Sequence, residues 1–293
     1  MSHGAETPRK RQRRLQFGLL GLLAFVAVCA LGLWWWRWHT REERALELLR
    51  AKGAEIEWMT VYRHIVAGFP DDPLPADEHH YSAFVGPEWK GGNDGLDYLA
   101  DLSRLTDVSI VRARGVGDEG MRHLADIGEL ETLSISQVGI SDVGMRWLKG
   151  MSNLRAVYFE GLCVGDDRIR HLEHLPNLHQ LTITGDLFVT SKAVSNLNTN
   201  LRYLELRGAA ITDEGLKDFP PVDQLQELDL RDTLVTRQGL LHLKHLPRLT
   251  KIAIGAEGTN ELHIRSRDEW EQFLRDEARG SLPQGINDAK AQN

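Results

Sequence analysis

The hydrophobic positions between Leu105 and Ile254 repeat with a period of about 24 residues. In each unit leucine or another aliphatic residue keeps the spacing L-x-x-L-x-L. A fixed period of this length predicts a solenoid, in which identical strand and helix units stack on one another. The six full units begin at Leu105, Leu130, Leu154, Leu178, Leu201 and Leu225, and a truncated seventh begins at Leu249.

The second unit illustrates what each repeat encodes. Leu133 and Ile135 are two residues apart, so they share one face of a short strand, and the polar residues between them face the other way. Met145, Leu148 and Met151 then follow at helical spacing. Each unit therefore predicts one strand and one helix, and neither can bury its apolar side until the next unit stacks on it.

Aspartate recurs at the junction between strand and helix, as in VGDEG at Val116 and ITDEG at Ile211. A short oxygen-bearing side chain at this place can cap the first free amides of a helix. We therefore interpret the aspartates as helix caps rather than as an acid/base or metal site, and we expect weaker caps in the fourth unit (FVTSK at Phe188) and the sixth (Arg237). The four aspartates are Asp118, Asp142, Asp166 and Asp213.

The pattern L-x-x-L-x-L followed by I-T-D-x-G-L and a helix resembles the leucine-rich repeat over residues 94–254. The subtype is similar to that of F-box substrate receptors and of membrane-anchored planctomycete proteins. The resemblance implies an α/β right-handed solenoid with short parallel strands on the concave face and helices on the convex face. It also implies that the asparagine ladder of other repeats is replaced mostly by small or apolar packing at Ala113, Val138, Leu162, Asp186, Ala209 and Thr233.

The segments on either side of the repeats are predicted to form caps and linkers. A half unit at Asp94–Leu102 predicts an N-terminal cap helix, and residues 255–279 predict a C-terminal cap with a closing helix at Arg267–Asp276. Residues 39–93 predict a juxtamembrane helix at Arg41–Lys52, a short apolar segment from Ile56 to Ile65 that could form a strand, and an irregular linker or cap. Residues 280–293 are expected to be a disordered tail.

The N-terminal region predicts a membrane anchor. Residues 15–36 contain no charge over 22 positions, which is long enough for a helix to cross a bilayer, and we assign 15–38 as the anchor. A basic tail at residues 1–14 precedes it, which favours a cytoplasmic N-terminus and an extracytoplasmic repeat domain. A cleaved signal peptide is the competing interpretation, but the apolar stretch is longer than a signal core.

The net charge argues against a nucleic-acid partner, and the cysteine content argues against an internal disulfide. The chain carries a formal charge of −7, and residues 1–38 contribute six basic and one acidic side chain, which leaves −12 for the remainder. An acidic outer domain would repel nucleic acid, so no nucleic-acid partner is expected. Only two cysteines occur, and one of them, Cys29, lies in the anchor, so no internal disulfide is expected.

Few residues in the sequence suggest a metal-binding or catalytic site. HLEHL at His171 and HLKHL at His242 each place two histidines at a spacing that zinc can use. The pairs occupy the same repeat position, with His123 in register, so we expect them to face outward on the convex side without binding metal. No phosphate loop, nucleophile elbow or zinc-protease helix is present, and we expect neither an enzyme nor a cofactor.

The polar strand residues that alternate with the buried leucines are predicted to line the concave face. The early units are small and neutral there, whereas the third, fifth and sixth carry aromatic and charged residues of the kinds enriched at protein interfaces. The alternative is a solvated sheet whose charges pair across neighbouring strands. The predicted partner-binding residues are Tyr158, Glu160, Tyr203, Glu205, Arg207, Asp229 and Arg231.

Three functions are compatible with these features. The first is a single-pass membrane protein whose external repeat domain binds a protein or peptide partner. The second is a structural or assembly component of the cell envelope that packs through its convex face. The third, an F-box-like substrate adaptor, is disfavoured because the apolar segment stands where an F-box would be required.

Overall fold

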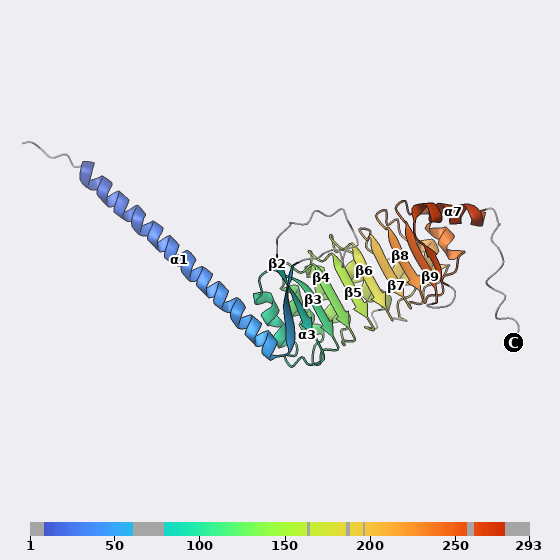
Figure 1. Cartoon of the computed structure of the whole chain (residues 1–293), viewed down its shortest axis with the longest axis horizontal. Coiled ribbons are helices and arrows are strands. Elements are labelled where there is room, and N and C mark those ends of the chain that lie inside the picture. Colours follow the sequence, from blue (N-terminus) through green and yellow to red (C-terminus); the bar gives the residue numbers. More distant parts are fainter. Residues whose placement is uncertain are drawn as a thin grey trace, which may run out of the picture.

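The computed structural model describes residues 9–60, 79–162, 165–185, 188–195, 197–256 and 261–278. The described part forms a ten-stranded sheet in which the strands follow the order of the sequence from β1 to β10. Figure 1 shows these strands side by side along the molecule, with the long helix α1 projecting from one end. The predicted tail at 280–293, the first eight residues of the basic tail, and Asp186 lie outside the described residues.

The repeats form the parallel middle of the sheet, as the period predicts. Seven strands from β3 to β9 run parallel to one another, and β2 joins them in the same direction. They span Leu105–Val111 (β3), Thr132–Ser136 (β4), Ala156–Glu160 (β5), Gln180–Thr184 (β6), Tyr203–Arg207 (β7), Glu227–Arg231 (β8) and Lys251–Gly255 (β9).

Short helices connect successive strands and pack against one another along the other side of the sheet. Several are 3₁₀ helices, which suits segments of only one or two turns. They span Asp94–Asp101 (η1), Asp118–Ala125 (α3), Asp142–Met145 (α4), Arg146–Gly150 (η2), Gly165–Ile169 (α5), Arg170–Leu172 (η3), Ser191–Val194 (α6), Gly215–Asp218 (η4) and Gly239–His245 (η5).

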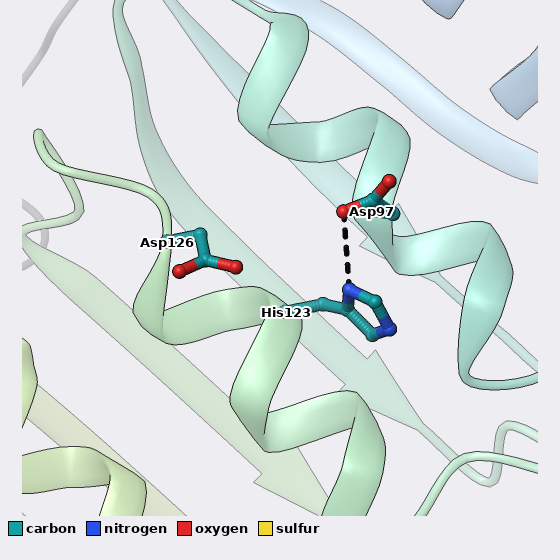
Figure 2. Close-up of side chains that lie close together, drawn as sticks. All are labelled: Asp97, His123 and Asp126. Carbon is teal, nitrogen blue, oxygen red and sulfur yellow. Dashed lines mark hydrogen bonds and ion pairs between the residues drawn. The ribbon is translucent and has the colours of Figure 1, made fainter.

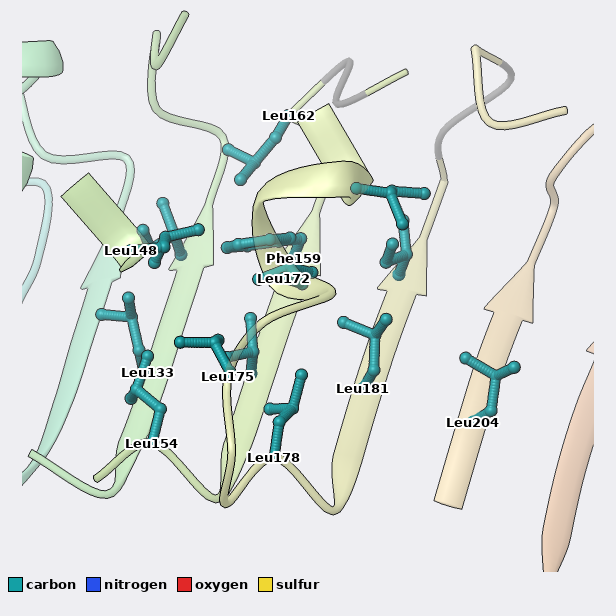
Figure 3. Packing of buried hydrophobic residues seen from close by; sticks show 14 of the residues in the cluster. Leu133, Leu148, Leu154, Phe159, Leu162, Leu172, Leu175, Leu178, Leu181 and Leu204 are labelled. Atoms are coloured by element: carbon teal, nitrogen blue, oxygen red, sulfur yellow. The ribbon is translucent and has the colours of Figure 1, made fainter. Parts of the chain in front are cut away.

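One continuous hydrophobic core runs through the stack. Leu133 of β4, Leu181 of β6 and Leu204 of β7 are fully buried at the same position of their units. Figure 3 shows how leucines such as Leu172 of η3, Leu178 just before β6 and Leu181 of β6 fill the space between neighbouring units. The positions that replace the asparagine ladder are also buried at Ala113, Val138, Leu162 and Ala209, as predicted. A single unit therefore buries its apolar residues only when neighbouring units pack against it.

The N-terminal end of the sheet is more regular than the sequence indicated. We predicted an irregular linker within residues 39–93, but the described part contains β1 (Ala54–Thr60) and β2 (His79–Val85), which pair antiparallel and cap the first repeat. The prediction missed β2 because its alternation is short and follows a segment rich in proline and acidic residues. Val61 and Ile65, which were also part of the predicted apolar segment, lie outside the described residues.

Helix α1 (Arg9–Ala51) is 43 residues long, and its last turns belong to the repeat domain. Ala45 and Leu49 are buried in the same core as the repeats. The carboxylate of Glu42, which is also buried, accepts a hydrogen bond of 2.7 Å from the Ser103 hydroxyl. Among the described residues, no helix is both long enough and apolar enough to span a bilayer.

The C-terminal end is closed by two elements. Strand β10 (Leu262–Ile264) pairs antiparallel with β9. Helix α7 (Arg267–Ala278) buries Trp270 and Phe273 against the end of the core, with the two rings stacked 5.5 Å apart. The closing helix was predicted, whereas β10 was not.

We had predicted that the junction aspartates cap their own helices, but the structure shows that they do not. Instead Asp118 accepts hydrogen bonds from the backbone amide and hydroxyl of Ser141 in the next unit. Asp166 does the same with Thr190, at 2.7 and 2.6 Å, and Asp213 with Thr236, also at 2.7 and 2.6 Å. These contacts form a ladder between units, because each carboxylate holds a residue at or shortly before the start of the following helix.

Two of the three hydroxyl residues held by this ladder are helix caps, namely Ser141 of α4 and Thr190 of α6, whereas η5 begins at Gly239 without a side-chain cap. Ser141 accepts a hydrogen bond from the Val143 amide, and Thr190 accepts one from the Lys192 amide, both at 3.2 Å. Thr236 accepts one from the Gln238 amide, again at 3.2 Å. The expected weakness was therefore wrong for the fourth unit, where the Thr190 hydroxyl caps α6, and it agrees with the sixth unit, where no side chain caps η5.

The glycine of the junction motif has a related role. A Cβ atom added at Gly144 would lie 2.5 Å from Oδ1 of Asp118, and one added at Gly239 would lie 2.1 Å from Oδ1 of Asp213. Real side chains do not approach so closely, so the absence of a side chain makes room for the carboxylate of the preceding unit.

The ladder is interrupted at Asp142. The next unit offers Gly165 where a hydroxyl would be needed and Arg168 at the position of the junction glycine. Asp142 instead lies 2.8 Å from Nε2 of His171 and 2.9 Å from Nη2 of Arg146. A cavity of about 740 Å³ lies beside this interruption, and Arg146, Arg168, His171 and the exposed Phe188 are among its lining residues.

Candidate binding surface

The sheet face that points away from the helices corresponds to the predicted concave face, and we call it the open face. Strand register places the polar residues of this face in three rows that cross the strands. The middle row contains Ser134, Tyr158, Thr182, Glu205 and Asp229. The predicted rows are thus formed, because parallel strands with a constant repeat length align equivalent residues.

The other two rows complete the face. The last row, toward the ends of the strands, holds Ser136, Glu160, Thr184 and Arg207, and Arg231 occupies the equivalent place on β8. The first row, at the strand beginnings, holds Thr132, Ala156, Gln180, Tyr203, Glu227 and Lys251.

Tyr203 and Glu205 form a polar pair on β7. The phenol oxygen of Tyr203 donates a hydrogen bond of 2.9 Å to Oε2 of Glu205. Burial raises the pKa of Tyr203 well above its usual range, and the negative charges of Glu205, Asp229 and Glu227 raise it further. The ring therefore stays protonated and keeps its O–H as a donor.

Tyr158 lies in a negative environment on β5. Burial, followed by the charges of Asp107 and Glu205, raises the pKa of Tyr158 to about 12. Its neighbours in the middle row, Ser134 and Thr182, have short side chains. The half-buried ring thus lies between two acidic positions.

The ion pairs of the open face match the alternative of charges paired across neighbouring strands in part: Lys251 of β9 binds Glu227 of β8, but the specific pairs that we considered do not form. Arg231 binds Asp229 on its own strand through several hydrogen bonds, two of which measure 3.0 and 2.9 Å. Arg207 donates to Oδ2 of Asp232 at 2.9 Å, and Asp232 follows β8 in the left-handed conformation with φ of 57°. Most of the predicted positive charge is therefore matched by a carboxylate beside it.

The Arg231 pair raises the pKa of its guanidinium above the usual range, mainly through the hydrogen bonds from Arg231 to Asp229. The charges of Glu261 and Glu205 act in the same direction. Arg231 is therefore held in a locally negative field even after it has paired with Asp229.

The sequence identified part of this surface and missed the rest. Asp107, Asp232 and Lys251 were not among the predicted site residues, yet Asp232 fixes Arg207 and Lys251 binds Glu227 at 2.6 Å. The row alignment carried a signal for Asp107 and Lys251, because both occupy the first row. His263 had no such signal, since it lies on β10 outside the repeat.

Strand β10 is the edge strand at the C-terminal end of the open face. A cavity of about 180 Å³ lies there between β7 and β10. Two of the predicted residues, Tyr203 and Asp229, line it together with residues of the last three strands, which include Glu227, Lys251, Ala253, His263 and Arg265. The open face is thus bounded at this end.

A separate cluster on the helix side was tested as a metal site. Figure 2 shows His123 of α3 next to Asp97 of η1, with Nδ1 of His123 3.1 Å from Oδ1 of Asp97. Candidate ligand atoms of these residues and of Asp126 lie within 4.8 Å of one another. Imidazole and carboxylate groups are ligands that zinc accepts.

The surroundings of this cluster fit an ion-pair network better than a metal site. Nη2 of Arg122 lies 3.1 Å from Nε2 of His123, and Nη1 lies 3.9 Å from Oδ2 of Asp126, so a guanidinium already supplies positive charge. The same pairing of histidine with a carboxylate of the preceding unit recurs between His171 and Asp142. We interpret both contacts as links between successive helices.

These contacts also correct one sequence prediction. We expected the histidines of the helices to face outward on the convex side. His174 and His245 are exposed as predicted, but His123 is buried, because the helices of neighbouring units pack closely enough for it to reach Asp97.

The acidic field around Tyr158 can be measured by titration. The difference in ultraviolet absorbance between the protein and its Tyr158→Phe variant should show phenol ionisation near pH 12, against about 10 for an unperturbed tyrosine. Neutralising Asp107 by Asp107→Asn should lower this midpoint, because a negative charge near the phenolate is lost. Glu173→Gln on the helix side should leave it unchanged. A midpoint near 10 in the folded protein, with circular dichroism as the check on folding, would contradict the described field.

Comparison with models of protein families and with curated proteins gives no match. Among solved structures, an internalin (inlF) and InlP, both from Listeria monocytogenes, match 56% and 58% of this chain with 18% and 21% identity and TM-scores of 0.39 and 0.40. The matches cover 57% and 48% of those chains, so this chain spans about half of their length.

The plant peptide hormone receptor RGFR1, in complex with RGF2, is 17% identical over 56% of this chain and 26% of its own, with a TM-score of 0.33. At such identities a likeness bears on the fold alone, and the low TM-scores add no argument to it. The assignment of a leucine-rich-repeat solenoid therefore rests on the repeated strand, junction and helix of this chain itself.

Proposed function

We propose that the chain is a single-pass membrane protein whose repeat domain lies outside the cytoplasm and binds a protein or peptide partner through the open face. The carrying observation is the concentration of tyrosines and charged residues on β5, β7 and β8, where the early strand β4 has only small polar residues. Tyrosine and arginine contribute disproportionately to protein interfaces. No reaction is proposed, and the expectation that the chain is not an enzyme stays a prediction.

The membrane part of the proposal is supported by the N-terminal sequence. The uncharged stretch 15–36 follows a basic segment, and both features favour an anchor with its N-terminus in the cytoplasm. Large apolar side chains of α1 between Leu23 and Trp36 are exposed, and they need a cover that the repeats do not provide. A bilayer supplies such a cover, with the tryptophans at its outer interface.

The second candidate is assembly through the convex face. Val143 and Trp147 lie four residues apart on the helix side and are both exposed, so they form a small apolar surface away from the open face. This surface is smaller than the three rows of the open face, which is why binding through the open face is preferred. The adaptor role remains the least favoured of the three.

A crosslinking experiment separates the two faces. The full chain is expressed in cells with a photo-crosslinking phenylalanine analogue in place of Tyr203 on the open face, and in a second variant in place of Trp147. We expect a discrete covalent adduct from the Tyr203 position, because an aromatic residue in the interface contacts the partner directly. Adducts from the Trp147 position alone would contradict the proposal and support assembly through the convex face.

Topology is tested by protease treatment of intact cells. With the repeat domain outside the cytoplasmic membrane, an added protease that reaches the outer side of that membrane should digest the repeats, and it should leave a tag fused to the N-terminus intact. A cytoplasmic protein should serve as the control for cell integrity. Protection of the repeats together with the tag would overturn the proposed location.

A further inference from the structure

We propose that the open face around Tyr158 binds a cationic side chain, a lysine or an arginine, from a basic peptide segment of the partner. This inference rests on the proposed function and specifies the chemistry of its partner. It is carried by three carboxylates on the same face as Tyr158, of which Asp107 and Glu205 act on its phenol, and by the ion pairs that already engage the cations of the face.

The three carboxylates are Asp107, Glu160 and Glu205. Among the described residues their hydrogen-bond partners are hydroxyl groups and not cations. Asp107 accepts from the Thr106 hydroxyl at 2.6 Å, Glu160 accepts from the Ser136 hydroxyl at 3.0 Å, and Glu205 accepts from Tyr203 at 2.9 Å. Each carboxylate therefore keeps its negative charge without an ion-pair partner bonded to it.

The other charges of the face are matched. Arg231 is bonded to Asp229, Arg207 to Asp232, and Lys251 to Glu227. An acidic partner would have to separate these pairs before it could use their cations. A basic partner meets carboxylates whose existing bonds to hydroxyls leave oxygen lone pairs available.

The three carboxylates lie on strands to either side of Tyr158 and on its own strand. Glu160 is two residues from Tyr158 on β5, while Asp107 lies two strands away on β3 and Glu205 two strands away on β7. At about 4.8 Å between strands these backbones lie roughly 10 Å on either side, which is close to the screening length at physiological salt. A cation over the ring is thus attracted by all three charges.

The ring itself contributes to cation binding. The face of a tyrosine ring attracts an ammonium or guanidinium group. Ser134 and Thr182, the neighbours of Tyr158 in the middle row, have short side chains, and Tyr158 is half-buried between them. Burial is the largest cause of the raised pKa of Tyr158, and the charges of Asp107 and Glu205 raise it further. Only these two charges, and not the burial, favour a cation there.

The test uses the full-length protein and two fluorescent probe peptides, octalysine and octaglutamate, at physiological salt. Fluorescence anisotropy should show binding of octalysine and none of octaglutamate. The variant Asp107→Asn/Glu205→Gln should bind octalysine about tenfold more weakly, since two favourable charge contacts are lost. The matched control, Glu129→Gln/Glu173→Gln, removes two exposed carboxylates from outside the open face and should change affinity less than about twofold.

An equal loss in both double variants would overturn the proposal, because it would show attraction by net charge alone. Binding of octaglutamate with an affinity equal to that of octalysine would also overturn it. Because the changes from carboxylate to amide alter shape little, circular dichroism should remain that of the parent protein. A second pair of variants tests the ring: Tyr158→Phe should keep octalysine binding, and Tyr158→Leu should weaken it about threefold. Equal binding by these two would contradict the role of the ring.

This result and that of the crosslinking experiment are distinguishable. If crosslinks form on the open face but octalysine does not bind, the cationic specificity is wrong while the proposed function stands. If crosslinks form only at Trp147, the proposed function is wrong, whatever the probe peptides do.

Discussion

The structure depends on the contact between one repeat and the next. No unit can bury its strand leucines and its helix residues alone, so Leu133, Leu181 and Leu204 become core residues only because the neighbouring units cover them. Burying one leucine contributes roughly 2 kcal/mol, and several such residues recur in every unit. The ladder from Asp118 to Ser141, and from Asp213 to Thr236, adds a directional contact at or shortly before the start of the following helix.

The same constraint produces the regular rows of the proposed binding surface. Because the repeat length is nearly constant, equivalent strand residues fall into rows, and any change of residue type along a row alters one defined place on the open face. Tyr158, Glu205 and Asp229 are such changes within one row. The repeats form a regular scaffold, and the proposed function rests on the residues that depart from the repeat pattern.

The 24-residue period allowed the repeat strands, the buried leucines, the N-terminal cap helix and the rows to be predicted from sequence. The closing helix was predicted from the helical spacing of its own apolar residues. Contacts between units could not be predicted in this way. The aspartates looked like caps because their position in the motif fits a cap, but their partners lie about 24 residues later in the chain. His123 looked exposed for the same reason, until its contact with Asp97 of the preceding helix was visible. Strands β2 and β10 lie outside the repeat, so the 24-residue period did not predict them.

The ladder provides the most direct test of the claim that neighbouring units hold each other. Asp118→Ala removes the carboxylate that holds Ser141, whereas Glu119→Ala removes an equal charge from the same turn of α3, where its contact is an exposed ion pair with Arg122. Free energies of unfolding from urea titration should fall by about 1 to 3 kcal/mol for Asp118→Ala. The loss should stay below about 1 kcal/mol for Glu119→Ala. Equal losses in the two variants would contradict the account, because they would assign the effect to charge at the start of the helix and not to the contact between units.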